Sequence, residues 1–223
     1  MSIFSQGARS FLLLALLTAW TLRVPAQEPV TTVADLEWNW FQAHCRGLLT
    51  ALANQKCPMP LGTTSAVERL LQAPPQDPDR RAIAIQELLD PYCLVVVTIN
   101  PESRVKAVRG PAPAELKLGR ETICLVKVIN EAGVTHRLHA GGPQVRDNVH
   151  AGAERWLEIS ARGQPPLRGN LSGQRAQYCL FGLTAREMGK REASLQFDVG
   201  QGTQDLGFRA ELPILFKVTG DKP

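Results

Sequence analysis

The sequence is poor in aromatic residues and carries little net charge, and both properties exclude classes of function. Only 6% of the residues are Phe, Trp or Tyr, which argues against a platform on which bases or sugar rings would stack. The formal net charge is +4, and basic residues alternate with acidic ones along the chain. A surface that binds nucleic acid needs clustered positive charge. The sequence therefore predicts no nucleic acid among the partners.

Motifs of common catalytic sites are also missing. The sequence has no Gly-x-Ser-x-Gly elbow, no Gly-Lys-Ser/Thr phosphate loop and no Cys-x-x-Cys-His haem attachment sequence. His44 and Cys45 are neighbours, but consecutive residues of a helix point about 100° apart. We therefore expect no catalytic residue and no cofactor.

Only one long apolar run occurs, and it lies near the N-terminus. Phe11–Leu22 follows the basic Arg9 and precedes the small residues Val24-Pro25-Ala26. About a dozen residues are fewer than the roughly 20 that span a bilayer, and the pattern is that of an export signal. We predict that residues 1–26 are a signal peptide cleaved before Gln27, with an uncleaved membrane anchor as the alternative. The mature chain is then secreted or periplasmic in the cell envelope, has no stable membrane span and carries about +2.

The cysteine content permits disulfides in an exported protein, but its odd number leaves at least one thiol unpaired or intermolecular. Cys45 and Cys57 flank a predicted helix end, where a bridge fits. Cys124 and Cys179 lie in predicted strands with Trp156 between them, the order found in immunoglobulin domains, although the tyrosine that precedes the second cysteine there is missing. Buried unpaired thiols that pack as small hydrophobic groups are the favoured interpretation for this pair. The five cysteines are Cys45, Cys57, Cys93, Cys124 and Cys179.

The first part of the mature chain, residues 27–91, is predicted to be helical. Apolar residues recur at spacings of three and four, and prolines separate the periodic runs. We expect this small segment to pack on the rest of the protein. The predicted helices are Val33–Asn54, Ser65–Gln72 and Pro78–Leu89, the last with Asp77 as its N-cap.

Residues 92–223 alternate apolar and polar residues with a period of two, which is typical of strands with one buried face. About seven short strands, with no helix-length pattern between them, exclude a parallel βαβ sheet. We predict a mainly β fold, an antiparallel sandwich of the immunoglobulin or fibronectin-III type preceded by the small α-helical segment. Strands are predicted at Cys93–Ile99, Arg104–Val108, Glu121–Ile129, Arg155–Ala161, Gln177–Thr184 and in two runs of Arg191–Val218, which a glycine-rich turn joins.

Three histidines in one polar segment raise the hypothesis of a metal site. His136, His139 and His150 occur there together with Asp147 and Glu154. Residues three apart face opposite sides of a strand, so His136 and His139 share a site only where the segment is a loop. We interpret these histidines as belonging to a solvated loop.

A second metal candidate is the glycine-rich turn that contains Asp198 and Asp205. Calcium needs several oxygen ligands, but two positions that would supply them are occupied by Gly200 and Gly202. We interpret the aspartates as caps of backbone amides in a turn that sets the last two strands in register.

Three segments resemble a module of secreted proteins from planctomycete-type bacteria: VTINPESRVKAVRGPAPAEL, VKVINEAGVT and REASLQFDVGQGTQDLGFRAELPILF. The resemblance covers roughly Leu94–Phe216. In larger members the module precedes a metallohydrolase domain of the polymerase-and-histidinol-phosphatase type. Here the resemblance implies no hydrolase part, because the chain ends at Pro223 and His136-Arg-Leu-His139 is not the His-x-His that such enzymes use. No catalytic residue carries over.

These observations predict an exported, non-catalytic interaction or accessory module that contacts another envelope protein or a cell-surface polymer. The alternative is a metal-dependent hydrolase component with its site in the His136–Glu154 loop. A third hypothesis is a stand-alone relic of a longer hydrolase.

Overall fold

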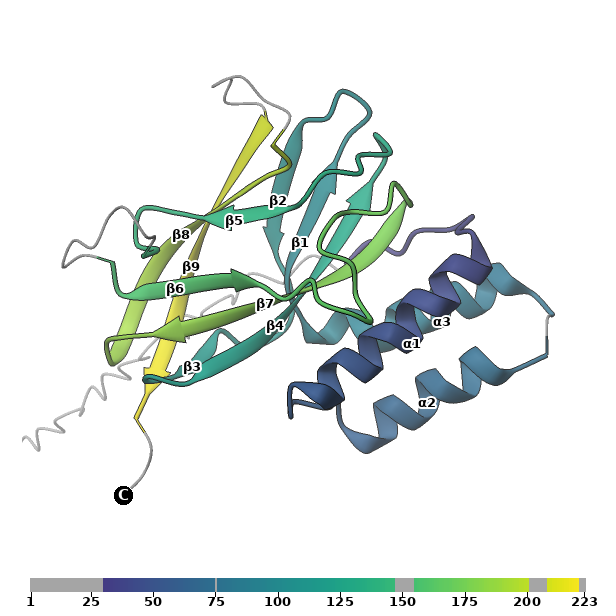
Figure 1. Cartoon of the computed structure of the whole chain (residues 1–223), viewed down its shortest axis with the longest axis horizontal. Helices are drawn as coiled ribbons and strands as arrows, with labels where there is room; N and C mark the ends of the chain where they lie inside the picture. The colour runs from purple at the N-terminus through teal and green to yellow at the C-terminus, as the bar shows by residue number, and fades with distance from the viewer. Residues whose placement is uncertain (1–29, 75, 147–154, 201–207, 221–223) are drawn as a thin grey trace, which may run out of the picture.

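The computed structural model describes residues 30–74, 76–146, 155–200 and 208–220, and over these ranges the protein is mainly β with a helical part at its N-terminus (Figure 1). The helices are α1 (Trp38–Asn54), α2 (Leu61–Gln72) and α3 (Pro78–Leu89), followed by a 3-10 turn, η1 (Asp90–Tyr92). The strands are β1 (Cys93–Ile99), β2 (Val105–Arg109), β3 (Glu115–Lys117), β4 (Glu121–Asn130), β5 (His139–Gly141), β6 (Leu157–Ala161), β7 (Ala176–Ala185), β8 (Gly189–Asp198) and β9 (Arg209–Thr219).

The third predicted helix is confirmed, and the first two begin elsewhere than expected. Helix α3 starts at Pro78, and the Asp77 carboxylate accepts the Arg80 amide at 3.0 Å. Helix α1 starts five residues after Val33, because the Glu37 carboxylate caps its first turn. Helix α2 already begins after Pro60, whose carbonyl accepts the first helical hydrogen bond. Among the described residues no helix is long and apolar enough to cross a membrane.

The strands form two curled sheets, and both are mixed rather than antiparallel as predicted. Their orders are β2-β1-β4-β7-β6 and β3-β9-β8-β5. Strand β1 runs parallel to β4, and β3 runs parallel to β9. The chain leaves the first sheet after β2, forms β3 in the second sheet and returns beside β1 as β4, and such a crossover gives a parallel pair. Each sheet has the shape of a half-barrel.

The five-stranded sheet is the middle layer of the protein and is buried on both faces. Val95 and Val97 of β1 face the four-stranded sheet, whereas Val96 faces the helices. This two-sided burial explains the unbroken apolar run of β1, since a strand covered on one face alone would alternate. The four-stranded sheet is covered on one face only, and its strand β9 alternates between buried residues such as Phe216 and exposed residues such as Lys217. Figure 1 shows the helices grouped on the outer side of the β-part.

A buried ion pair joins the helical part to the middle sheet. Lys127 on β4 points toward the helices with its side chain 0% exposed, and its Nζ lies 2.7 Å from Asp90 Oδ2. The same ammonium donates to the Thr31 carbonyl at 2.9 Å, and the Tyr178 hydroxyl on β7 donates to Asp90 Oδ1 at 2.9 Å. Burial raises the pKa of Asp90 and lowers that of Lys127, while their attraction and hydrogen bonds act in the opposite direction. Every charge in this cluster therefore has a partner.

We predict that Lys127→Met lowers the free energy of unfolding by about 3–5 kcal/mol, because Asp90 is then buried without a counter-charge. The double variant Asp90→Leu/Lys127→Met should lose less than the single variant, since both charges leave together. Urea unfolding at pH 7 measures both. The control is Arg186→Met, which breaks an exposed pair with Glu158 and should lower the free energy of unfolding far less than Lys127→Met does. Equal effects of Lys127→Met and Arg186→Met would contradict a role for the buried pair.

Candidate binding site at a sheet edge

The outer edge of β7 is only partly covered by its neighbour β6. Pairing runs from Leu157 opposite Ala185 to Ala161 opposite Phe181, so in the described part of the chain no strand pairs with Ala176–Leu180 on that side. After β6 the chain continues as the segment Arg162–Ser172, here called the strap. The Arg162 amide still donates to the Leu180 carbonyl at 2.8 Å, and the strap then passes over the open edge.

The strap is anchored in both hydrophobic cores. Leu167 packs into the core between the helices and the middle sheet, and Leu171 packs into the core between the two sheets. The Leu171 amide also donates to the His136 carbonyl at 3.0 Å. The loop is closed tightly on itself, because a Cβ on Gly163 would lie 2.2 Å from Gly169 Cα. The strap therefore wraps around the sheet edge from one layer to the other.

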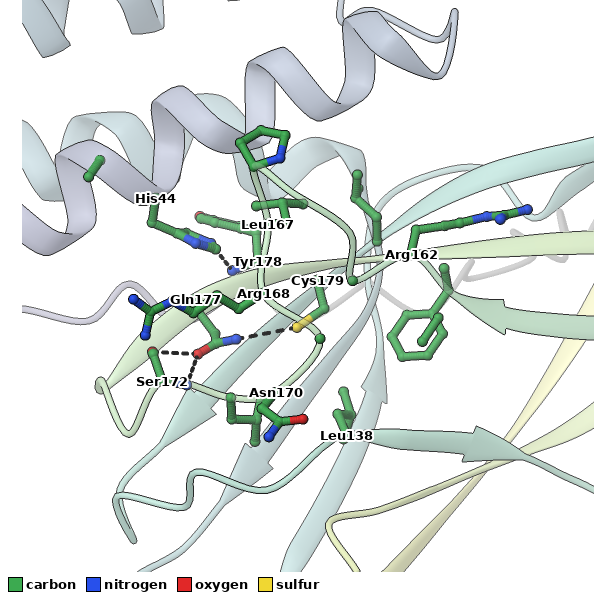
Figure 2. Close-up of a pocket in the computed structure, with 18 of the residues that line it drawn as sticks. His44, Leu138, Arg162, Leu167, Arg168, Asn170, Ser172, Gln177, Tyr178 and Cys179 are labelled. Atoms are coloured by element: carbon green, nitrogen blue, oxygen red, sulfur yellow. Dashed lines mark hydrogen bonds between the residues drawn. The ribbon is translucent and has the colours of Figure 1, made fainter.

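A cavity of about 240 Å³ lies between the strap, helix α1 and the edge of β7 (Figure 2). Apolar walls come from all three elements and from the segment before β5, with Trp40, Leu138 and Phe181 among them. Polar side chains from α1, the strap and β7 complete the lining: His44, Arg168, Asn170, Ser172, Gln177 and Cys179.

His44 takes the place of a missing strand at the edge of β7. Its Nε2 accepts the backbone amide of Tyr178 at 2.9 Å, a hydrogen bond that a neighbouring strand would normally make. The imidazole stacks on Trp40, with ring centroids 4.8 Å apart. Burial lowers the pKa of His44 from 6.5 to about 4. The ring is therefore neutral at physiological pH, and because Nε2 accepts a hydrogen bond, the ring proton resides on Nδ1.

Gln177 links the strap to the thiol of Cys179. Its Oε1 accepts hydrogen bonds from the Ser172 amide at 2.8 Å and the Ser172 hydroxyl at 2.7 Å, and its Nε2 donates to Cys179 Sγ at 3.5 Å. Burial raises the pKa of Cys179 to about 11. The thiol is therefore protonated and is not an activated nucleophile. These polar groups hold one another in place rather than forming a nucleophile and a base.

The surroundings of the cavity are positively charged. None of the described residues that line it is acidic. Arg162 is paired with Glu121 and, as Figure 2 shows, extends away from His44 and Ser172. Arg168 is exposed at the cavity, and the guanidinium of Arg137 lies 3.4 Å from where a Cβ on Gly169 would be.

The structure brings together two of the predicted metal candidates but not a metal site. His139 on β5 lies directly opposite Asp198 on β8. Asp198 Oδ1 accepts the Gly200 amide at 3.0 Å, which confirms its interpretation as a turn cap. His136 precedes β5 and is exposed. Within the described ranges no three His, Cys, Asp or Glu side chains are close enough to hold a metal ion. The remaining residues of both hypotheses lie outside the described ranges: Asp147, His150, Glu154, Gly202 and Asp205.

All five cysteines are free thiols, so the bridge between Cys45 and Cys57 that the sequence left open is not formed. Cys45 lies on the buried face of α1, and the Cys57 amide donates to the Leu52 carbonyl near the end of that helix. Seven helical residues separate Cys45 from Leu52, about 10 Å along the axis, which exceeds the span of a disulfide. Cys124 and Cys179 face the same core on paired strands, but the register places them diagonally and not opposite each other.

Sequence reasoning missed this cavity and the side chains that line it. In the sequence the strap shows no periodic pattern, and His44 is one polar residue of a predicted amphipathic helix. One signal was available. Three glycines and two adjacent prolines follow a predicted strand between Gly163 and Gly173, a composition that indicates a tightly shaped loop.

None of the protein-family models matches the sequence, and no curated protein matches it. Four chains of solved structures match. One of them, from a structure of PbICP-C in complex with falcipain-2, is 9% identical, with 47% of this chain and 84% of that chain covered and a TM-score of 0.27. A likeness of that extent carries no argument about this chain.

We predict that His44 makes stability depend on pH. Its folded pKa is lowered, so the unfolded chain binds a proton that the folded chain does not between pH 6.5 and about 4. The contribution is complete above pH 6.5 and is lost as pH falls, with a slope of up to about 1.4 kcal/mol per pH unit. In His44→Gln the amide oxygen can still accept the Tyr178 amide without titrating. Urea unfolding at several pH values should show that the free energy of unfolding depends less on pH in His44→Gln than in wild type. The control is His136→Gln, which replaces an exposed histidine. Equal pH dependence of the two variants would contradict the assignment to His44.

We predict that Cys57 is the thiol that reacts first in the folded protein. Burial raises the pKa of Cys57 as well, but this thiol is partly exposed, whereas Cys45 and Cys93 are buried and burial raises the pKa of Cys124 to about 12 and that of Cys179 to about 11. Labelling with a maleimide at pH 8, followed by mass spectrometry, should show one rapid addition. Cys57→Ser should remove it and leave the other thiols to react only after unfolding. A second rapid addition in that variant would be inconsistent with this burial.

Proposed function

We propose that the protein is an exported, non-catalytic interaction module that contacts another envelope protein or a cell-surface polymer. The observation that carries the proposal is the cavity under the strap, because it combines an open strand edge, apolar walls and a charged rim. Sites of this composition bind ligands through shape and a few placed polar groups.

The state of the polar groups favours binding over chemistry. His44 is neutral and already accepts a backbone amide, and Cys179 is protonated beside a neutral amide. A nucleophilic cysteine needs a nearby base or cation that lowers its pKa. Here burial shifts the pKa of the thiol in the opposite direction.

An immunoglobulin-like or fibronectin-III-like sandwich and a relation to the secreted planctomycete-type module belong to the same proposal. The two sheets pack face to face around Trp156, whose ring meets Phe216 edge-on with centroids 6.0 Å apart. A buried tryptophan between two sheets supports this finer description of the fold. Export rests on the predicted signal peptide. The hydrolase alternative in the His136–Glu154 loop stays a prediction, because residues 147–154 of the loop lie outside the described residues.

The test is affinity capture from envelope extract with two matched glycine variants of the exported, tagged protein. Gly163→Ala forces a Cβ against Gly169 and should displace the strap, whereas a Cβ on Gly62 of α2 meets no atom within 4 Å. We expect wild type and Gly62→Ala to retain one partner in stoichiometric amount. Gly163→Ala should retain at least tenfold less while its circular dichroism spectrum remains that of a folded β protein.

Two results would count against the proposal. One is the absence of any partner enriched by wild type over a tag-only column. The other is equal retention by both glycine variants, which would place the contact away from the strap.

A further inference from the structure

We propose that the cavity under the strap receives a carboxylate carried by an extended segment of a partner protein, an inference that rests on the interaction function proposed above. Three features of the site support it: the charge around the cavity, the hydrogen-bond donors among its lining residues, and the sheet edge at its base.

Arg168 supplies positive charge at the cavity. This side chain lines the cavity, is exposed and has no acidic neighbour among the described residues of the lining. Arg137 adds a second guanidinium close to Gly169 of the strap. Arg162 contributes no free charge, because Glu121 neutralises it. An anion placed at the rim therefore meets uncompensated positive charge, and a guanidinium matches a carboxylate in geometry.

His44 supplies a hydrogen-bond donor among the lining residues. Since its Nε2 accepts the Tyr178 amide, its Nδ1 carries the proton, and within the described part of the chain no hydrogen bond is made by that N–H. The side-chain amide of Asn170 also lines the cavity and is exposed. Both are donors whose capacity the fold leaves unused. A carboxylate needs several donors when water is displaced from it, and the cavity offers them.

The sheet edge favours a peptide over a sugar polymer. The base of the cavity includes Gln177–Leu180 of β7, where His44 and the strap, rather than a strand of the described chain, cover the edge. Because the Tyr178 amide and the Leu180 carbonyl are already bonded, a peptide would not pair with β7 but would lie beside the strap and place alternate side chains in the cavity. Uronic acid polymers present the same carboxylate, but sugar rings bind by stacking on exposed aromatic faces, and His44 covers the ring of Trp40. Leu138 and Phe181 instead supply walls for apolar side chains beside the acid.

The experiment titrates the exported protein, isotopically labelled, with three defined probes. They are an end-capped Val-Glu-Val-Glu-Val peptide, its Val-Gln-Val-Gln-Val counterpart and tetragalacturonate. We expect the acidic peptide to shift the amide signals of Asn170, Gln177 and Tyr178, and to bind at least tenfold more tightly than the other two probes. Raising the salt concentration should weaken its binding.

Two neutralising variants locate the carboxylate. Arg168→Gln should lower the affinity for the acidic peptide at least tenfold. Arg104→Gln removes an exposed arginine ahead of β2, away from the strap, and should change affinity less than twofold.

Equal binding of the glutamate and glutamine peptides, or equal effects of the two arginine variants, would overturn the carboxylate assignment. Preferential binding of tetragalacturonate would overturn the assignment of a protein segment and indicate that the ligand is an acidic polymer. If the strap-dependent partner is captured from extract but none of the three probes binds, the interaction function stands and the proposed ligand chemistry is wrong. If capture fails as well, both proposals are wrong.

Discussion

The structure depends on the ion pair between Lys127 and Asp90. A lysine in the middle of a central strand faces a wall of apolar side chains and has no route to solvent. Desolvating such a charge is costly unless a counter-charge and further hydrogen bonds lie at fixed positions. Those positions are the junction between α3 and β1, the neighbouring strand β7 and the segment before α1, which supplies the Thr31 carbonyl. The Lys127 side chain thus fixes three parts of the chain against the same face of the sheet. Apolar packing alone would not fix where they lie along that face.

The candidate site follows from that alignment. The sheet face on which α1 packs is the one that carries Lys127 and Tyr178, and once α1 is placed, His44 meets the backbone of Tyr178. The capped edge leaves room for the strap, whose two leucines enter different cores. The cavity lies where a longer β6 would otherwise pair with the rest of β7. Its neutral imidazole and protonated thiol result from burial in that space rather than from a catalytic arrangement.

Local patterns predicted the local structure well. Asp77-Pro78 defined the start of α3, and the β-branched run from Cys93 to Ile99 defined β1, because caps and strand periodicity are properties of neighbouring residues. The parallel partners could not be predicted, since β3 is too short to show a period and its partner lies at the other end of the chain. In the β4 sequence ETICLVKVIN the lysine is a single polar residue in an apolar strand, and only the packed structure shows that it forms an ion pair with Asp90. The cavity was missed for the same reason, since its residues come from α1, the strap and β7.

The pairing of β3 with β9 sets the order in which the protein can fold. Glu115 and Lys217, which form an ion pair across these strands, are separated by 102 residues. The second sheet therefore closes only after the last strand is available, and contacts of such high sequence separation form late and slowly. A polypeptide that threads through a translocation channel must remain unfolded until it has passed. Topology of this kind delays completion of the native state until the whole chain has emerged, a behaviour that agrees with the export proposed above.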